Sequence, residues 1–270
     1  MKLLKIILDF YINSSIHVAL AVFAFVRITQ LYFNLSYNES LDYFIFYGTI
    51  TGYNFVKYAG VAKLHHRSLT THLKIIQIFS LICFLLLCYY TWQLSIKTLL
   101  LIMPFGFLTL LYAVPFLSGF QKNLRSIGYL KIIIVALVWT GTTVVLPIYD
   151  TDLGFSYNVV LISIQRFLLV VTLILPFDIR DVKYDAISLQ TIPKKIGVQN
   201  TKKLGYVLLT MCLVLEFFIS SSIEFRISFL VIYSLLLILL FKSSENQSKY
   251  YSSFIVEAIP IFWFLFLSVF

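Results

Sequence analysis

Residues 178–197 read DIRDVKYDAISLQTIPKKIG and form the longest segment of this sequence that lipid would exclude. The segment carries three of the chain's twelve acidic residues, Asp178, Asp181 and Asp185. Their spacing of i, i+3 and i+7 would place the three carboxylates on one face of a helix. Because such carboxylates repel one another unless a cation lies between them, the segment predicts a site for Mg²⁺, which hard oxygen ligands suit.

An apolar run ending in Leu175-Pro176-Phe177 leads directly into this segment, so the acids are expected at a membrane surface. The segment resembles the second aspartate-rich motif of the UbiA superfamily of intramembrane prenyltransferases. That motif reads Asp-x-x-Asp, a further Asp four residues on, and then Thr-(Ile/Leu)-Pro-x-x-(Ile/Leu)-Gly. The matching residues are Asp178, Asp181, Asp185, Thr191-Ile192-Pro193 and Ile196-Gly197.

The composition excludes an ordinary soluble domain, because 60% of the 270 residues are hydrophobic and 12% are charged. A membrane-spanning helix needs roughly 20 apolar residues, and we find nine such runs in one domain, residues 1–270. The sequence therefore predicts an all-α, multi-pass membrane protein with nine transmembrane helices. The predicted spans are 10–33, 42–60, 74–92, 98–117, 128–149, 157–177, 204–222, 225–241 and 253–270.

The basic residues predict how these spans are oriented in the bilayer. Loops on one side hold seventeen Lys and Arg residues, and loops on the other side hold two. This bias places the N-terminus in the cytoplasm and the C-terminus outside, as in a bacterial inner-membrane protein. The net charge of +9 therefore reflects membrane orientation rather than nucleic-acid binding.

The loop after the second span departs from the family pattern. The family's first motif reads Asn-Asp-x-x-Asp-x-x-x-Asp, and alignment on Asn54 puts Phe55, Tyr58 and Ala62 where the acids belong. The loop is basic instead, with Lys57, Lys63, His65, His66, Arg67, His72 and Lys74. Two interpretations stay open. Either these charges only set the topology of a decayed motif, or Lys and Arg replace metal ions as counter-charge for a diphosphate.

A third stretch, after the fourth span, resembles the family's Tyr-Pro end of that span and the basic residues that follow it. The residues that could correspond are Tyr112, Pro115, Lys122, Arg125 and Lys131. The alternative is again that these charges only set the topology. Closer to the aspartates, Thr191 and Gly197 predict a short helix over 192–196, and Asn200 or Thr201 is expected to cap the next span.

Five charged or histidine residues lie four or more positions from the ends of predicted spans, where charge is costly and often functional. They are His17, Arg27, Arg166, Glu216 and Glu257. For Arg166 and Glu216, which lie on neighbouring spans, we favour a structural ion pair.

The resemblance implies transfer of a polyprenyl group from its diphosphate to a hydrophobic acceptor, such as an aromatic ring. Mg²⁺ would bind Asp178 and Asp181, with Asp185 as a further acid of the site. The residues expected to bind the diphosphate are Asn54, Lys57, Arg67, Tyr112, Lys122, Arg125 and Arg180. The alternative is a non-catalytic member that binds a prenyl lipid or a protein partner, because the first motif has lost its acids.

Overall fold

The computed structural model describes residues 2–62, 71–114, 124, 127–151, 153–183 and 191–269, and every regular element within these ranges is helical. The all-α prediction is therefore confirmed. The elements are α1 (Lys2–Asn13), α2 (Ile16–Tyr32), α3 (Glu39–Ala62), α4 (Thr71–Gln93), α5 (Ile96–Ala113), α6 (Leu130–Thr140), η2 (Gly141–Val145), α7 (Leu146–Asp150), α8 (Tyr157–Asp181), α9 (Ile192–Ile196), α10 (Val198–Phe218), α11 (Ile223–Lys242), η3 (Tyr251–Val256) and α12 (Ile259–Leu267).

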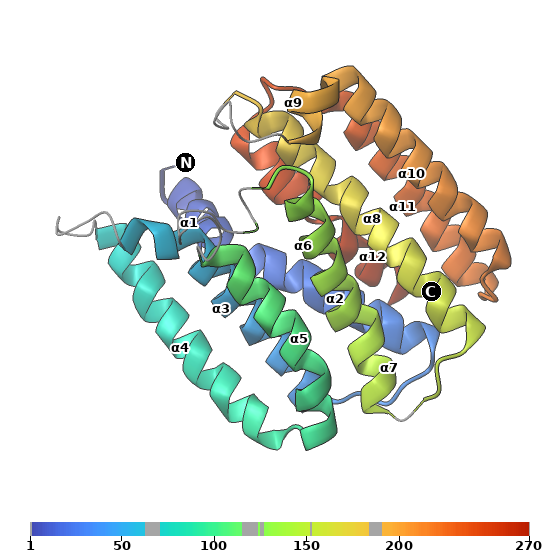
Figure 1. The fold of residues 1–270 in the computed structure, drawn as a ribbon, viewed down its shortest axis with the longest axis horizontal. Coiled ribbons are helices and arrows are strands. Elements are labelled where there is room, and N and C mark those ends of the chain that lie inside the picture. The colour runs from blue at the N-terminus through green and yellow to red at the C-terminus, as the bar shows by residue number, and fades with distance from the viewer. Residues whose placement is uncertain are drawn as a thin grey trace.

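The long helices pack side by side into a bundle (Figure 1). On one side α3 packs against α4 and α5, and on the other side α8 and α11 pack against α10. Helix α2 contacts both α3 and α12, and α6 joins α5 to α8. The core lies where these helices meet, with the Phe25 ring 6.1 Å from Trp139 and 6.3 Å from Trp263, measured between centroids.

Each predicted span overlaps a helix, but the structure does not establish nine membrane crossings. Among the described residues, five helices are long and apolar enough to cross a membrane. They are Leu73–Gln93, Ile96–Ala113, Leu130–Asp150, Tyr157–Asp181 and Ile223–Lys242. Helix α3 is more polar because it contains Asp42 and Asn54, which are buried, and Lys57, which faces an internal chamber.

The first predicted span, 10–33, is two helices rather than one. Helices α1 and α2 meet at an angle of 56°, and would add a sixth crossing if they form one broken span. The break lies at Ser14 and Ser15, and Ser15 has a left-handed backbone with φ of 66°. Serine hydroxyls bond to nearby backbone or side-chain groups and so favour breaks of this kind.

The outer faces of α4 and α5 are strongly apolar. Leu81, Leu85 and Trp92 on α4 are more than half exposed, and Leu100 and Phe107 on α5 are similarly exposed. A contiguous apolar surface of this kind marks an interface with protein or membrane. Together with the five long apolar helices, it fits a multi-pass membrane protein.

The predicted ion pair between Arg166 and Glu216 is wrong, because the structure gives the two residues separate partners. The Arg166 guanidinium lies 4.0 Å from the centre of the Phe25 ring and donates to the Phe25 carbonyl (3.1 Å) and the Thr143 hydroxyl (3.2 Å). Glu216 instead accepts a hydrogen bond of 2.9 Å from the Gln165 amide. Each group therefore satisfies its hydrogen-bonding needs without the other.

Candidate functional site

A chamber of about 1130 Å³ opens inside the bundle, larger than the roughly 300–1,000 Å³ of pockets that hold one drug-sized ligand. Helices α1 to α6, α8 and α12 supply the lining, together with η2 and the region of η3. Charged residues line one part of the chamber: Asp9, Lys57, Lys131, Asp178, Arg180, Asp181, Lys249 and Glu257. The remainder is mostly apolar, so the chamber can take an ionic group and a hydrocarbon together.

The aspartate motif forms one wall of the chamber, which we call the α8 wall. Asp178 and Asp181 lie in the last turn of α8, where the helix dipole disfavours negative charge. Cations offset this: the Lys131 ammonium is 2.7 Å from Asp178 Oδ1, and the Arg180 Nε is 2.7 Å from Asp181 Oδ1. The Asp178 side chain is 2% exposed and that of Asp181 is 34% exposed.

The short helix that follows the motif was predicted correctly. Helix α9 covers Ile192–Ile196, with Thr191 at its N-cap position and Gly197 at its end. Gly197 has φ of 81°, which favours glycine, and α10 begins at the next residue, Val198. The expectation that Asn200 or Thr201 caps this helix is wrong, because both lie inside its first turn.

The α8 wall is fastened to the region of η3. Pro176 lies inside α8, and its carbonyl accepts hydrogen bonds from the Gln247 amide (2.7 Å) and the Ser252 hydroxyl (3.2 Å). The Arg180 guanidinium also donates to the Lys249 carbonyl at 3.5 Å. These bonds fix the position of the aspartates relative to the last helical segment.

A second acid reaches the chamber from α1. The Asp9 carboxylate accepts hydrogen bonds from the Lys249 ammonium (2.6 Å) and the Tyr250 hydroxyl (2.8 Å). The hydrogen bond from Lys249 to Asp9 raises the pKa of that lysine above its usual value. This contact joins residues 240 positions apart in the chain, so no local sequence pattern indicates it.

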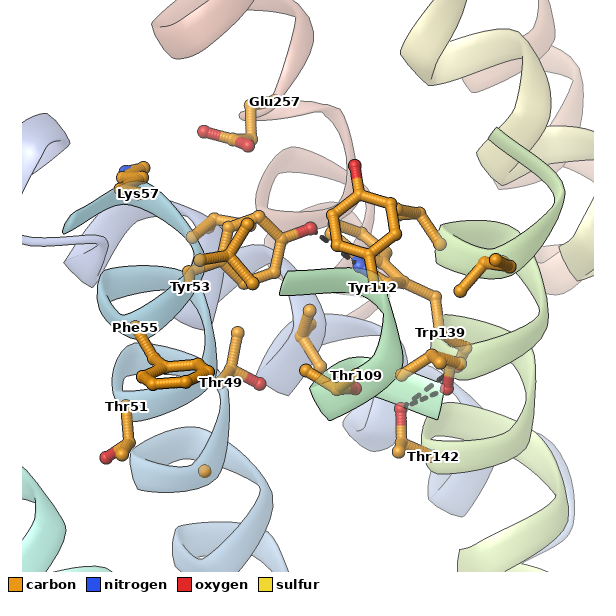
Figure 2. A pocket seen from close by; sticks show the side chains of 18 of the residues that line it. Thr49, Thr51, Tyr53, Phe55, Lys57, Thr109, Tyr112, Trp139, Thr142 and Glu257 are labelled. Carbon is orange, nitrogen blue, oxygen red and sulfur yellow. Dashed lines mark hydrogen bonds between the residues drawn. The ribbon is translucent and has the colours of Figure 1, made fainter. Parts of the chain in front are cut away.

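The opposite wall, which we call the α3 wall, carries Tyr53 and Lys57. The Lys57 ammonium donates to the Ser15 hydroxyl at 2.8 Å and to the Ile12 carbonyl at 3.3 Å. The Tyr53 hydroxyl accepts a hydrogen bond of 2.9 Å from the Trp139 indole. Figure 2 shows both residues with Tyr112 and Glu257 in the same pocket.

Most of the predicted site residues that are described do line the chamber. These are Lys57, Tyr112, Asp178, Arg180 and Asp181. Asn54 points elsewhere: it is 3% exposed, its amide donates to the Ser14 carbonyl (3.0 Å) and its side-chain oxygen accepts from Ser15 (2.8 Å). Four further predicted residues lie outside the described part of the chain, namely Arg67, Lys122, Arg125 and Asp185.

The chamber also contains charged residues that the sequence did not assign to the site. Asp9 near the start of the chain, Lys131 and Glu257 are candidates without a firm role in the sequence, and Lys249 contributes only to the charge bias of the loops. For Glu257 the available signal was a carboxylate within an apolar run.

The donor atoms of the α8 wall fit a particular kind of metal ion. Asp178 and Asp181 lie three residues apart on α8 and line the same chamber. Within the described ranges, no three His, Cys, Asp or Glu side chains gather closely enough to hold a metal by themselves. The wall therefore suits an ion such as Mg²⁺, which takes one or two carboxylates and completes its shell with water and substrate phosphates.

No protein-family model and no curated protein matches the sequence of this chain. Solved structures do match its fold. A UbiA homologue from Archaeoglobus fulgidus bound to GPP and Mg²⁺ aligns with a TM-score of 0.65 and 13% identity, covering 97% of this chain and 98% of that chain. The same homologue bound to DMAPP and Mg²⁺ gives a TM-score of 0.59 and 14% identity, covering 100% and 98%.

A third match is a structure of digeranylgeranylglyceryl phosphate synthase, with a TM-score of 0.59 and 15% identity over 98% of both chains. Identities this low establish similarity of fold and no more. The expected resemblance is thus confirmed over the full length of the bundle, and this chain has the fold of the UbiA homologues.

Proposed function

We propose that this protein is an intramembrane prenyltransferase, which moves a polyprenyl group from its diphosphate to a hydrophobic acceptor with Mg²⁺ as cofactor. The observation that carries the proposal is the chamber of about 1130 Å³, charged in one part and apolar elsewhere. A prenyl diphosphate has the same division between an ionic head and a hydrocarbon tail. The neighbours bound to GPP or DMAPP with Mg²⁺ support this choice of substrate.

Residues from both walls bind the donor. Lys57 on the α3 wall and Arg180 on the α8 wall hold diphosphate oxygens, and Arg67, Lys122 and Arg125 are proposed to assist them. The apolar part of the chamber encloses the prenyl chain and excludes water from the allylic cation. The ring faces of Tyr53 and Trp139, which line the chamber, favour positive charge near them.

The aspartates complete the donor site. Mg²⁺ bound by Asp178 and Asp181 would neutralise the charge that develops on the departing diphosphate. Lys131 holds the Asp178 carboxylate in place from α6 through their contact of 2.7 Å. We assign Asp185 a supporting role as a further acid of this wall.

We further propose that the single domain spans the membrane nine times, with the charged part of the chamber facing the cytoplasm. The basic loops and the apolar outer faces of α4 and α5 support this orientation and placement. A reporter fused after Phe270 is then expected outside the cytoplasm, as in a bacterial inner-membrane protein.

A second candidate function is non-catalytic binding of a prenyl lipid. One observation favours it: in the described structure both aspartates of the α8 wall already contact a cation, through Lys131 and Arg180. A chamber with internally balanced charge can hold an uncharged prenyl lipid without any metal ion.

Labelled geranyl diphosphate separates the two candidates. The purified protein is incubated with it and with trial acceptors such as phenols and prenyl alcohols, with and without Mg²⁺, and the release of diphosphate is measured. An enzyme releases diphosphate when Mg²⁺ is present, and chelation of the metal stops the release. Binding without release would instead support the non-catalytic function.

The same protein also tests how many metal ions the site uses. Because the α3 wall lacks the acids of the family motif and carries the cation Lys57, we expect no more than one Mg²⁺ per chain beside Asp178. Calorimetric titration in the presence of a non-hydrolysable donor analogue measures this number, and two tightly bound ions would contradict the expectation.

A further inference from the structure

Two carboxylates of the chamber, Asp9 and Glu257, lie outside both motif regions, and Glu257 is the one without a close ion pair among the described residues. Glu257 directly follows η3, and it lines the chamber together with Lys57, Tyr53 and Tyr112. Figure 2 shows Glu257 at the same end of the pocket as Lys57 and the Tyr112 hydroxyl. The positive charges that act on the Glu257 carboxylate are those of Lys57 and Arg180, which are the cations proposed to hold the diphosphate.

Glu257 follows a π-helical segment that hydrogen bonds and ring stacking hold in place. Segment η3 is a π-helix, a rare form that occurs frequently at functional sites, and the Glu257 N–H bonds the Ser252 carbonyl five residues earlier. The His17 imidazole bonds the Phe254 carbonyl at 2.9 Å and stacks on the Phe254 ring at 5.0 Å. The position of the carboxylate is therefore fixed by contacts to α2, as well as by the Ser252 contact to α8.

Glu257 also differs from the other acids of the chamber in its pairing. Asp9, Asp178 and Asp181 each contact a cation at 2.6 or 2.7 Å. Within the described ranges, Glu257 forms no ion pair of this closeness, although Lys57 and Arg180 influence it. It is thus the chamber carboxylate best able to accept a proton from a ligand.

We propose that Glu257 is the proton acceptor for the second substrate, and that this substrate is an uncharged hydroxyl compound with an apolar body, such as a simple phenol. This inference rests on the proposed prenyl transfer. The negative charge of the bound diphosphate repels an anionic acceptor, so a neutral hydroxyl is favoured over an acceptor that carries a carboxylate.

The step conserves atoms and charge. The bond between C1 of the prenyl group and the diphosphate oxygen breaks, and its electron pair leaves with the diphosphate. A lone pair of the acceptor hydroxyl oxygen forms the new bond to C1, giving an ether. The hydroxyl proton passes to the Glu257 carboxylate, which later returns it to solvent.

The test uses geranyl diphosphate and Mg²⁺ with either hydroquinone, a neutral phenol, or 4-hydroxybenzoate, which carries a carboxylate. We expect ether formation from hydroquinone to be at least about tenfold faster than from 4-hydroxybenzoate. The carboxylate of 4-hydroxybenzoate would be buried without a partner, and the free-energy cost of this burial lowers the rate by about tenfold or more. Replacing Glu257 by Gln should lower ether formation by about 10²–10⁴-fold, the usual contribution of a general base. It should lower diphosphate release without an acceptor far less.

Two further variants distinguish a chemical role from a structural one. Glu257→Asp keeps a carboxylate and should recover part of the ether formation. Glu216→Gln changes another buried glutamate, which bonds Gln165 and Ser221 and does not line the chamber, and should leave ether formation unchanged. Wild-type rates in Glu257→Gln, or faster reaction of 4-hydroxybenzoate in the wild type, would overturn the inference.

Failure of the proposed function gives a separate result. If the wild type releases no diphosphate, hydroquinone binding is measured through quenching of tryptophan fluorescence, since Trp139 lines the chamber. Weaker binding of hydroquinone to Glu257→Gln than to the wild type would support an acceptor site at Glu257. Equal binding to both proteins overturns it.

Discussion

The two polar walls of the chamber use their residues in different ways. On the α8 wall the motif keeps its acids, and Lys131 and Arg180 lie 2.7 Å from Asp178 and Asp181. On the α3 wall the corresponding acids are absent, and Asn54, Lys57 and Tyr58 instead hold the turn between α1 and α2. Their side chains bond consecutive residues there: Ile12, Asn13, Ser14 and Ser15.

This difference fits the metal-binding role proposed for the α8 wall and gives the motif residues of the α3 wall a structural role in holding the turn between α1 and α2. The Tyr58 hydroxyl, where the family has an acid, donates to the Asn13 carbonyl at 3.0 Å. Phe55, at another lost acid, lines the chamber as an apolar surface. A donor diphosphate would therefore meet metal on the α8 wall and an ammonium on the α3 wall.

The largest effect is expected on the α8 wall. Asp178→Ala should lower diphosphate release by about 10²-fold or more, as loss of a transition-state charge contact does. It should also destabilise the fold by up to roughly 3–5 kcal/mol, because it removes the 2.7 Å contact between the Lys131 ammonium and the Asp178 carboxylate in a largely buried site. Thermal unfolding and the diphosphate assay measure the two effects.

Asp181→Ala is the matched control for this prediction. Its side chain is 34% exposed, so activity should fall while stability changes by only about 0–1 kcal/mol. The double variant Asp178→Ala, Lys131→Met should recover stability without recovering activity. Full activity in Asp178→Ala and in Asp181→Ala would remove the α8 wall as the metal site.

A smaller effect is expected on the α3 wall. Lys57→Gln should weaken binding of geranyl diphosphate by about 10- to 100-fold, since a hydrogen bond to a charged group contributes roughly 1.5–3 kcal/mol. Lys203→Gln, an exposed lysine on α10 away from the chamber, is the control. Equal affinities of the three proteins for the donor would mean that Lys57 serves the α1–α2 turn alone.

The same contrast separates what the sequence could predict from what it could not. The all-helical fold, helix α9 and the end at Gly197 follow from local signals: apolar runs, a proline in the first turn and a glycine with positive φ. The break at Ser14 and Ser15 was missed, because the two serines interrupt an otherwise helix-like apolar run only weakly.

Contacts between distant segments left no trace in the sequence. Asn54 matches the first residue of the family motif, yet its buried position toward Ser14 and Ser15 depends on how α3 packs against α2. Likewise the pairing of Asp9 with Lys249 depends on the whole bundle closing. The sequence can suggest that a charged residue lines a chamber. Which residue it pairs with depends on tertiary packing, which local sequence patterns do not indicate.

The smallest effect is expected for Gln247, whose hydrogen bonds connect the α8 wall to η3. The Gln247 amide bonds both the Pro176 carbonyl (2.7 Å) and the Ser252 hydroxyl (2.5 Å), which connects the α8 wall to η3 and so to Glu257. Gln247→Ala removes these bonds and should lower the free energy of unfolding by about 1 kcal/mol. Chemical denaturation measures this loss.

Because the Gln247 link positions one wall against another, its loss should affect transfer to the acceptor more than binding of the donor. Ser252 retains its own contact of 3.2 Å to the Pro176 carbonyl, so the rearrangement should be modest and donor affinity should stay near that of the wild type. Gln93→Ala, which removes a bond to Ser40 far from the motif, controls for loss of an amide. If Gln247→Ala leaves acceptor transfer at the wild-type rate, the α8 wall and Glu257 are positioned independently of this link.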